Sequence, residues 1–502
     1  MVFGRGQQVS LADAVRQALI TGPLVETRLE GKATYFGVPS NYKLEIGDGC
    51  KYVQRISGPL GEVFGFDGKT EWKEDRSGAP RVMGFEDGDE ERAIVGLLTD
   101  QWIDAGTRAV ISPDVLDVNT IDVTSPSGLD ERVTVDPNTL KPAKAVFHTT
   151  DGEVDIKLSD WRPAAGRQLP FAAEVTRGGL TDKFQVNGAT AAMGDYGEPA
   201  WKPSDAGFNP SVSPNLETKK APFGLILVHP KINGKDVGWF ILDSGSEVMV
   251  IDPKVADKLH LTKIGKQPLT GVGGTIQAAF RTGGEVTLGP LTIHNVIFTE
   301  FDLGQLGNAF KINLGGIVGY DVFRRSIVAV DVKTPAVSIY QPDKYHLPKG
   351  AYWTEMLFDG GNPVVQASCE GNRMAWYRLD TGDPSSVTFH APYVNREHLL
   401  DSRTLGDAAT GGVGGQARAR TGQIGWFQLG GHRFENENAT FSLADKGAFA
   451  NRYLAGNIGQ ALMMPFVTTF DFGADRVAFV PREPALPGPL STASASHESA
   501  AP

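Results

Sequence analysis

The sequence predicts a mostly β fold in which a β-rich N-terminal domain precedes one β unit that occurs twice. The 502 residues include 60 glycines and 31 prolines, and this composition favours turns and short strands over long helices. Turn signals such as Asp67-Gly68 and Asp136-Pro137-Asn138 recur through the first part of the chain. After a polar segment that ends near residue 222, sequence landmarks repeat in the same order at nearly constant spacing.

The N-terminal part is expected to consist mainly of strands from Val25 to about Thr190. One amphipathic helix is expected at 11–20 and a second around 90–103. The stretch before residue 222 is rich in Pro, Ser, Asn and Lys, which is typical of a linker. These patterns predict an accessory domain at 1–205, a linker at 206–222, two lobes at 223–345 and 346–482, and a disordered tail at 483–502.

Five landmarks mark the duplicated unit. The segment from Trp239 to Gly245 aligns with the segment from Trp376 to Gly382, 137 positions later, and a glycine turn precedes each copy at the same offset, at Gly234 and Gly371. Further along, each copy has a Gly-Val-Gly-Gly run, an apolar-apolar-Gly motif and a closing strand that carries an aspartate. In order these are Gly271-Val272-Gly273-Gly274 and Gly412-Val413-Gly414-Gly415, Ile317-Val318-Gly319 and Leu454-Ala455-Gly456, and the strands with Asp331 and Asp471.

Each copy places an aspartate at the end of an apolar strand, in Asp243-Ser244-Gly245 and Asp380-Thr381-Gly382. The strand holds the carboxylate rigidly, the hydroxyl can bond to backbone and brace the turn, and the glycine allows a close backbone approach. If the two copies face each other, their carboxylates lie side by side. At ~3 Å and an effective dielectric constant of ~20, two anions repel each other by about 5 kcal/mol. Such a pair shares one proton, so that one member is a base and the other an acid.

These motifs resemble the paired active-site motifs of aspartic proteases, and the resemblance covers about 224–482. The Gly-Val-Gly-Gly runs resemble the glycine-rich flaps of retroviral-type enzymes, and Ile317-Val318-Gly319 resembles the hydrophobic motif that packs under each catalytic loop. The resemblance implies two pepsin-like or retropepsin-like β-barrel lobes on one chain, with a cleft between them. An extended peptide would be held there under flaps formed by Gly271, Val272, Gly273, Gly274, Gly412, Val413, Gly414 and Gly415.

The sequence departs from that family pattern at several places. Ala455 is a small residue at the second apolar position of its motif, and no tyrosine lies near either glycine run. Asp383 stands where the family usually has Ala, Ser or Thr. This third carboxylate would raise the pKa values of the pair, or lie in a pocket that favours basic side chains, or mark an inactive lobe.

The N-terminal domain resembles the lipoprotein-carrier proteins of bacteria in two short motifs. These are Gly65-Phe66-Asp67-Gly68 with Trp72, and Gly166-Arg167-Gln168-Leu169-Pro170. The resemblance implies an α+β accessory domain with a curved sheet that holds a lipid or an apolar peptide. The alternative is a scaffold or prodomain packed on the lobes.

Composition excludes several other classes of function. The formal net charge of -11 argues against general nucleic-acid binding, and two cysteines are too few for a disulfide scaffold or a Cys-rich zinc site. No apolar run reaches the length of a membrane span. The chain has no His-Glu-x-x-His and no Gly-x-Ser-x-Gly motif, and the glycine spacing in 65–70 does not match a phosphate-binding loop.

The sequence therefore predicts an aspartic endopeptidase whose catalytic residues, Asp243 and Asp380, activate a water between them. The supporting residues are Ser244, Gly245, Thr381, Gly382 and Asp383. The expected partner is a polypeptide substrate, with no metal, no cofactor and no nucleic acid. Both aspartates lie on one chain, so a monomer is expected to be sufficient. The alternatives are an inactive pseudoprotease that binds extended peptides and a lipid- or lipoprotein-binding protein. The family resemblance implies a periplasmic or otherwise exported protein, although the first residues lack a signal-peptide pattern.

Overall fold

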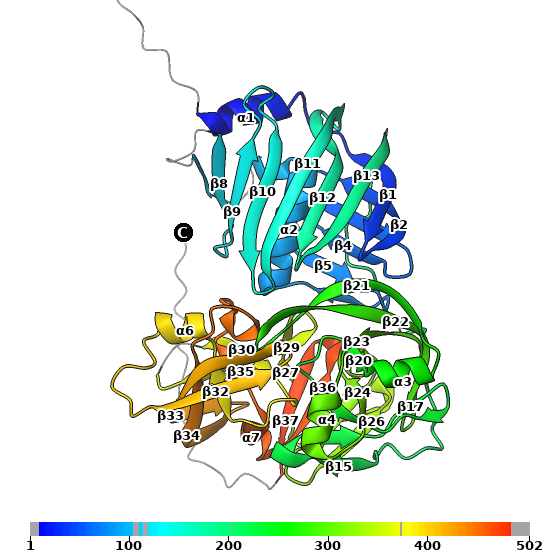
Figure 1. The fold of residues 1–502 in the computed structure, drawn as a ribbon, viewed down its shortest axis with the longest axis vertical. Helices are drawn as coiled ribbons and strands as arrows, with labels where there is room; N and C mark the ends of the chain where they lie inside the picture. The colour runs from blue at the N-terminus through cyan, green and yellow to red at the C-terminus, as the bar shows by residue number, and fades with distance from the viewer. Residues whose placement is uncertain (1–9, 104–109, 114–118, 202, 372–373, 483–502) are drawn as a thin grey trace, which may run out of the picture.

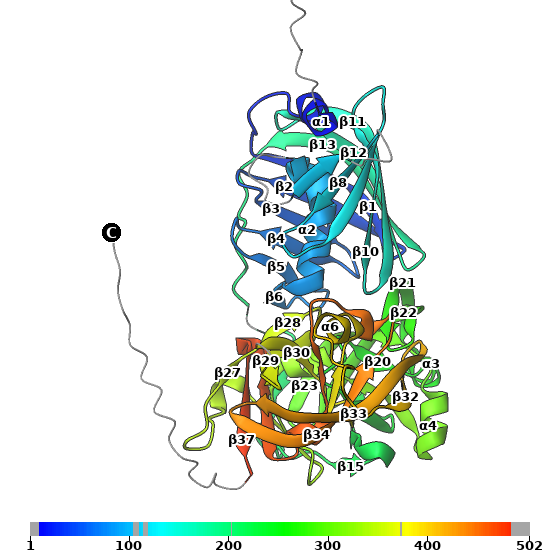
Figure 2. The same cartoon turned by 90° about the vertical axis from the view of Figure 1, so that its left-hand side faces the viewer.

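The structure is a computed structural model that describes residues 10–103, 110–113, 119–201, 203–371 and 374–482. It is mostly β, which confirms the predicted fold class. Figures 1 and 2 show a curled N-terminal sheet above a β-rich body with two lobes. The segment 483–502, which we expected to be a disordered tail, lies outside the described residues.

The accessory domain is built on one antiparallel sheet of 13 strands. Their order is β6-β5-β4-β3-β2-β1-β13-β12-β11-β10-β9-β8-β7, so almost every strand pairs with its neighbours in the chain. The strands are β1 (Thr27–Tyr35), β2 (Val38–Ile46), β3 (Tyr52–Ser57), β4 (Glu62–Phe66), β5 (Glu71–Glu74), β6 (Pro80–Val82), β7 (Val110–Pro113), β8 (Thr120–Thr124), β9 (Asp130–Val135), β10 (Pro142–Thr149), β11 (Gly152–Ala164), β12 (Arg167–Arg177) and β13 (Leu180–Ala191).

This sheet curls around a helix, α2 (Phe85–Thr99), as Figure 2 shows. The helix starts earlier than the predicted 90–103 and is followed by a short 3-10 helix, η1 (Gln101–Ile103). The amphipathic helix expected at 11–20 is α1 (Leu11–Leu19), where Ser10 caps the helix by accepting a hydrogen bond from the N–H of Asp13. Alternate side chains of the strands pack under α2, which gives the sheet one buried face and one exposed face.

The body below contains two lobes of related topology. Lobe 1 is an 11-stranded sheet with α3 (Pro253–Lys258), α4 (Gly304–Phe310) and α5 (Tyr320–Arg325), and lobe 2 is an 8-stranded sheet with α6 (Ala391–Arg396) and α7 (Gln460–Met463). The strands of lobe 1 are β14 (Ala206–Phe208), β15 (Thr218–Lys220), β16 (Ile226–Val228), β17 (Lys231–Ile232), β18 (Lys235–Asp236), β19 (Trp239–Leu242), β20 (Met249–Ile251), β21 (Thr262–Gly271), β22 (Gly274–Leu288), β23 (Leu291–Glu300) and β24 (Leu314–Val318). The strands of lobe 2 are β28 (Leu357–Asp359), β29 (Asn362–Cys369), β30 (Ala375–Leu379), β31 (Val387–Phe389), β32 (Gly406–Gly412), β33 (Gly415–Leu429), β34 (His432–Ser442) and β35 (Gly456–Ile458).

A third sheet joins the lobes. Its order is β26-β25-β36-β37-β27, so the closing strands of the two copies, β25 and β36, pair directly with each other. One large apolar core runs through both lobes and this sheet. The strands are β25 (Ile327–Asp331), β26 (Ala336–Tyr340), β27 (Thr354–Glu355), β36 (Phe466–Asp471) and β37 (Arg476–Pro481).

The segment 206–222, which we expected to be a linker, contributes strands to lobe 1. Here β14 pairs with β23, and β15 pairs with β16. Short polar strands at the margin of a sheet have the same composition as a linker, because much of their surface faces water. The path from the accessory sheet to lobe 1 is therefore the shorter stretch between β13 and β14.

The strand pairing corrects one sequence alignment. In lobe 1, β19 runs parallel to β24 and places Leu242 beside Val318, whereas in lobe 2, β30 runs parallel to β35 and places Leu379 beside Ile458. The counterpart of Ile317-Val318-Gly319 is therefore 457–459, three residues after Leu454-Ala455-Gly456. A constant offset failed because the loops between the landmarks differ in length. The small side chain of Ala455 consequently leaves no gap at this position, since the fully buried Ile458 fills it.

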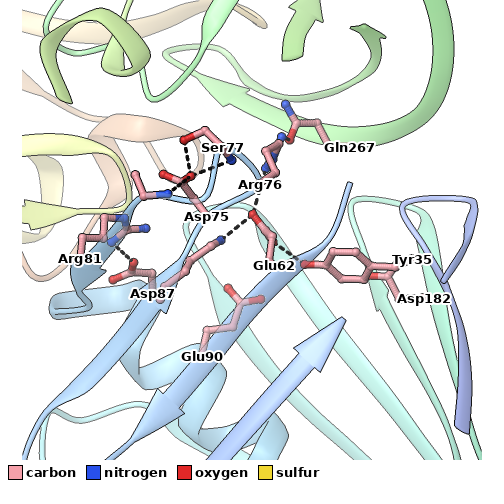
Figure 3. A network of polar contacts seen from close by, with 12 residues as sticks. Tyr35, Glu62, Asp75, Arg76, Ser77, Arg81, Asp87, Glu90, Asp182 and Gln267 are labelled. Carbon is pink, nitrogen blue, oxygen red and sulfur yellow. Dashed lines mark hydrogen bonds and ion pairs between the residues drawn. The ribbon is translucent and has the colours of Figure 1, made fainter. Parts of the chain in front are cut away.

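The accessory domain is bonded to the first of two long hairpins. We call β21–β22 the first hairpin and β32–β33 the second hairpin. The N–H of Lys266 donates to the carbonyl of Phe36 at 2.9 Å, and Arg76 donates to Gln267 at 2.9 Å (Figure 3). Nearer the tip, the hydroxyl of Thr275 donates to the carbonyl of Asp151 at 3.0 Å. Between the described residues, no hydrogen bond or ion pair joins the second hairpin to the accessory sheet.

Arg76 is one of the side chains that connect the accessory domain to the lobes. Its guanidinium lies 3.4 Å from the buried Glu62 and 4.7 Å from the ring centre of Phe280 on the first hairpin. Figure 3 shows this side chain between the accessory sheet and Gln267. It therefore couples a buried charge of the accessory domain to the position of the hairpin.

We predict that Arg76→Ala loosens the first hairpin and not the second. Losing a charged partner of a buried carboxylate costs about 1–3 kcal/mol, so local opening should become several-fold more frequent. Hydrogen–deuterium exchange should rise in 262–288 and stay constant in 406–429. Arg162→Ala, which removes an exposed arginine that pairs with Asp160, is the control. Equal exchange of the first hairpin in wild type and Arg76→Ala would contradict the prediction.

Candidate active site

The two Asp-(Ser/Thr)-Gly loops interlock across the boundary between the lobes. The hydroxyl of Ser244 donates to the carbonyl of Leu379 at 2.7 Å, and the hydroxyl of Thr381 donates to the carbonyl of Leu242 at 3.1 Å. In return, the N–H of Ser244 donates to the Thr381 hydroxyl and the N–H of Thr381 donates to the Ser244 hydroxyl, at 2.8 and 3.0 Å. Both side chains are fully buried. Each hydroxyl thus braces the opposite loop and not its own turn.

The glycines bring the two carboxyl groups together. The N–H of Gly245 donates to Oδ1 of Asp243, and the N–H of Gly382 donates to Oδ1 of Asp380, both at 2.8 Å. A Cβ atom on Gly245 would lie 2.7 Å from the carboxyl carbon of Asp380, and one on Gly382 would lie 2.5 Å from that of Asp243. Each carboxyl group therefore lies against the glycine of the other lobe, and no larger residue fits at either position.

The surroundings favour retention of a proton by this pair. Burial raises the pKa of Asp243, and burial together with the charge of Asp243 raises the pKa of Asp380. The positive charge of Arg378 acts in the opposite direction on both groups. Two neighbouring carboxyl groups with raised pKa values hold one proton between them over a wide pH range, as acid–base catalysis by a pair requires.

Asp383 lies beside the pair and also caps its own loop. Its Oδ1 accepts a hydrogen bond from the N–H of Ser385 at 2.8 Å. Burial, and then the negative charge of Asp380, raises the pKa of Asp383 to about 6. Its charge in turn raises the pKa of Asp243. These mutual effects are those of a like charge near the pair, which is one of the three roles expected for this residue.

The tips of the two hairpins touch each other. The N–H of Gly273 donates to the carbonyl of Val413 at 3.0 Å. A Cβ atom on Gly271 would lie 2.5 Å from Val413, and one on Gly414 would lie 2.4 Å from the carbonyl oxygen of Gly274. Gly414 also has a φ of +81°, which favours glycine. The two Gly-Val-Gly-Gly runs thus form the turns and the contact surface of the hairpin tips.

Three polar residues near the pair were missed by the sequence analysis. Asn457 donates from Nδ2 to Oδ2 of Asp380 at 3.1 Å, and its Oδ1 lies 3.2 Å from Nε2 of His390. Arg378 lies 3.5 Å from the carboxylate of Asp359. Arg378 was detectable as the one charge in the strand before Asp380, where the first copy has isoleucine. Asn457 was hidden by the misaligned apolar motif.

The described residues contain no group of three or more His, Cys, Asp or Glu side chains that could hold a metal ion. None of the helices in the described parts of the chain is long and apolar enough to cross a membrane.

We predict that Thr381→Ala destabilises the joined lobes. The change leaves the N–H of Ser244 without its acceptor and the carbonyl of Leu242 without its donor, and a buried unsatisfied polar group costs about 1–3 kcal/mol. The free energy of unfolding from urea titrations should fall by that amount. Thr381→Ser keeps the hydroxyl and should lose much less. If the two variants are equally stable, the hydroxyl does not join the lobes.

A sequence model of the aspartyl protease family matches residues 228–322, a range that holds Asp243 and the tip of the first hairpin. No curated protein matches the chain. Among solved structures, basic 7S globulin from soybean is 9% identical, with a TM-score of 0.35, and the match covers 55% of this chain and 95% of that one.

A second solved structure, a LolA superfamily protein from Nitrosomonas europaea, is 11% identical with a TM-score of 0.28, and the match covers 37% of this chain and 94% of that one. The family match lies entirely within lobe 1 and supports chemistry of the aspartic protease type.

Proposed function

We propose that this protein is an aspartic endopeptidase in which Asp243 and Asp380 together activate a water molecule. The observation that carries the proposal is the interlocked pair of loops, which brings two half-buried carboxyl groups together. The match of the lobe 1 segment to the aspartyl protease family supports it. Two carboxyl groups in this arrangement can hold one water and one proton at the same time.

In the proposed reaction, the ionised carboxylate takes a proton from the water as the oxygen attacks the peptide carbonyl. The protonated carboxyl group donates its proton to the carbonyl oxygen, so that a neutral tetrahedral intermediate forms. Collapse of the intermediate then breaks the C–N bond as a proton passes to the leaving nitrogen. The bonds from the Gly245 and Gly382 N–H groups hold the carboxylates in position for both steps.

The two hairpins serve in this proposal as flaps over an extended polypeptide. Their tips are joined to each other, so an unfolded segment enters after that contact opens. Because the pair and both hairpins belong to one chain, a monomer suffices. An inactive peptide-binding protein is the second candidate, and the extra carboxylate of Asp383 beside the pair is the feature that favours it.

We predict that Asp243→Asn and Asp380→Asn each abolish cleavage. Loss of a general acid or base costs about 10²–10⁴-fold in rate, and losing half of a shared pair should reach the upper end. The measurement is the rate at which purified protein cuts an unfolded polypeptide between pH 3 and 8, with circular dichroism to verify folding. Asp401→Asn, an exposed change in lobe 2, should cut at the wild-type rate. A wild-type protein that binds the polypeptide without cutting it would support the second candidate.

We predict that Asp383→Asn moves the pH–rate profile downward, by roughly half a pH unit or more. The asparagine keeps an oxygen for the Ser385 N–H but removes a negative charge. Without that charge, the ionised state of the pair costs less, so its apparent pKa values fall and activity persists at lower pH. An unchanged profile would show that Asp383 serves only as a loop cap.

A further inference from the structure

The two lobes differ on the strand face that carries the pair. In lobe 1 the strands β19, β20 and β24 place apolar side chains there, whereas the matching strands of lobe 2 place polar ones. The paired sets are Ile241, Val250 and Ile317 against Arg378, Thr388 and Asn457, and in each lobe the last residue lies between the other two across the sheet. Lobe 1 shows that this framework forms with apolar residues. Burying polar groups costs free energy unless they are bonded, so the fold alone does not call for the polar set.

Asn457 is buried and contacts one carboxyl group of the pair. Only 3% of its surface is exposed, and its Nδ2 donates to Oδ2 of Asp380 at 3.1 Å. The N–H of Gly382 donates to the other oxygen, so Asp380 receives two N–H donors. Apart from the hydrogen bond that the two carboxyl groups make with each other, Asp243 receives one donor among the described residues, the N–H of Gly245. This difference exists because position 317 of lobe 1 is an isoleucine and cannot donate.

His390 holds the amide of Asn457 in this orientation. The ring is fully buried, and its Nε2 lies 3.2 Å from Oδ1 of Asn457. Burial, and then the charge of Arg378, lowers the pKa of His390 to about 3, so the ring is neutral across the working range of the pair. The neutral ring has two tautomers, and in the one with its proton on Nε2 the ring donates to Oδ1, so that the amide N–H of Asn457 faces Asp380.

We propose that Asn457, oriented by His390, is a positioning residue that keeps Asp380 as the ionised member of the pair. A hydrogen-bond donor stabilises the charged form of a carboxyl group, and Asp380 has one donor more than Asp243. The shared proton then rests on Asp243 at the start of the reaction. Asp380 takes the proton of the water, and Asp243 protonates the peptide carbonyl. The inference rests on the proposed proteolytic function. It assigns the roles of base and acid to Asp380 and Asp243, which the duplicated motif alone does not distinguish.

Other charges face the same pair, and the inference takes them into account. Arg378 on β30 stabilises the ionised form of both carboxyl groups, and Asp383 opposes the ionisation of both. The charge of Asp243 itself opposes that of Asp380. Neither Arg378 nor Asp383 is changed by a substitution at 457, so such a variant isolates the amide donor.

The test replaces Asn457 with the residue that lobe 1 has at the same position. In Asn457→Ile, loss of the donor raises the pKa of the group that must be ionised. The acidic limb of the profile of kcat/KM against pH should therefore move to higher pH, with a roughly tenfold lower kcat and a nearly constant KM. Ile317→Val, the matched change in lobe 1, should leave the limb in place. An unmoved limb in folded Asn457→Ile would overturn the inference.

A second pair of variants covers the case in which Asn457→Ile does not fold. His390→Leu removes the group that orients the amide and should move the limb in the same direction. His390→Gln keeps a donor for Oδ1 and should restore most of the wild-type profile. If His390→Leu and His390→Gln have the same profile as the wild type, the ring does not orient the amide and the inference fails.

Titration of the carboxyl groups separates this inference from the proposed function. Carbon NMR of protein labelled at the aspartate side chains follows their ionisation without any substrate. If the wild-type protein cuts no polypeptide between pH 3 and 8, the proposed function fails. The titration still decides whether Asn457→Ile raises the pKa of the ionised member. If the wild type cuts and the titration curves of the two proteins coincide, only the role of Asn457 is refuted.

Discussion

The arrangement of this molecule depends on one interaction, the exchange of hydrogen bonds between Ser244 and Thr381. Four bonds cross the boundary between the lobes within a fully buried space, where each is protected from competition with water. Each loop is anchored to its own lobe because the aspartate N–H donates to the strand beside it, to Val318 in lobe 1 and to Ile458 in lobe 2, both at 2.9 Å. The two carboxyl groups thus have a fixed separation that neither lobe could set alone.

The same constraint explains why small residues are concentrated around the pair. With the loops this close, each carboxyl group lies where the side chain of the opposite glycine would be. Gly319 and Gly459 meet the loops from below, and a Cβ on either would lie 2.4 Å or less from a loop carbonyl oxygen. Glycine at these four positions is a requirement of packing distance, and it follows from the interlock.

Duplication makes the lobes alike in framework and leaves their surfaces free to differ. The first hairpin is bonded to the accessory domain through Lys266, Gln267 and Thr275. In the part of the chain that the structure describes, no hydrogen bond or ion pair joins the second hairpin directly to that domain, and its tip contacts the tip of the first hairpin. The strand face around Asp380 is polar, whereas the face around Asp243 is apolar. Two equivalent motifs therefore lie in different surroundings. Different surroundings allow two carboxyl groups to take different roles, one as acid and one as base.

The sequence by itself determined the mostly β fold, the duplication, the two Asp-(Ser/Thr)-Gly loops and the two glycine turns. These are local patterns, because a strand, a tight turn and a repeated motif are each specified by a few neighbouring residues. Their chemistry could be read for the same reason, since Asp243 and Asp380 each end an apolar strand.

Only the tertiary structure decided which distant residues meet. It placed Asn457 and not Leu454 at the position that matches Ile317, because strand register depends on loop lengths that a fixed offset ignores. Within the segment 206–222, which we expected to be a linker, the structure forms the two short strands β14 and β15. Pairing with β23 and β16 satisfies the backbone N–H and carbonyl groups of these strands. The tertiary structure also brought Arg76 to Gln267 across 191 positions of sequence and His390 to Asn457 across 67. Such contacts depend on how the sheets pack, and no local pattern of residues records them.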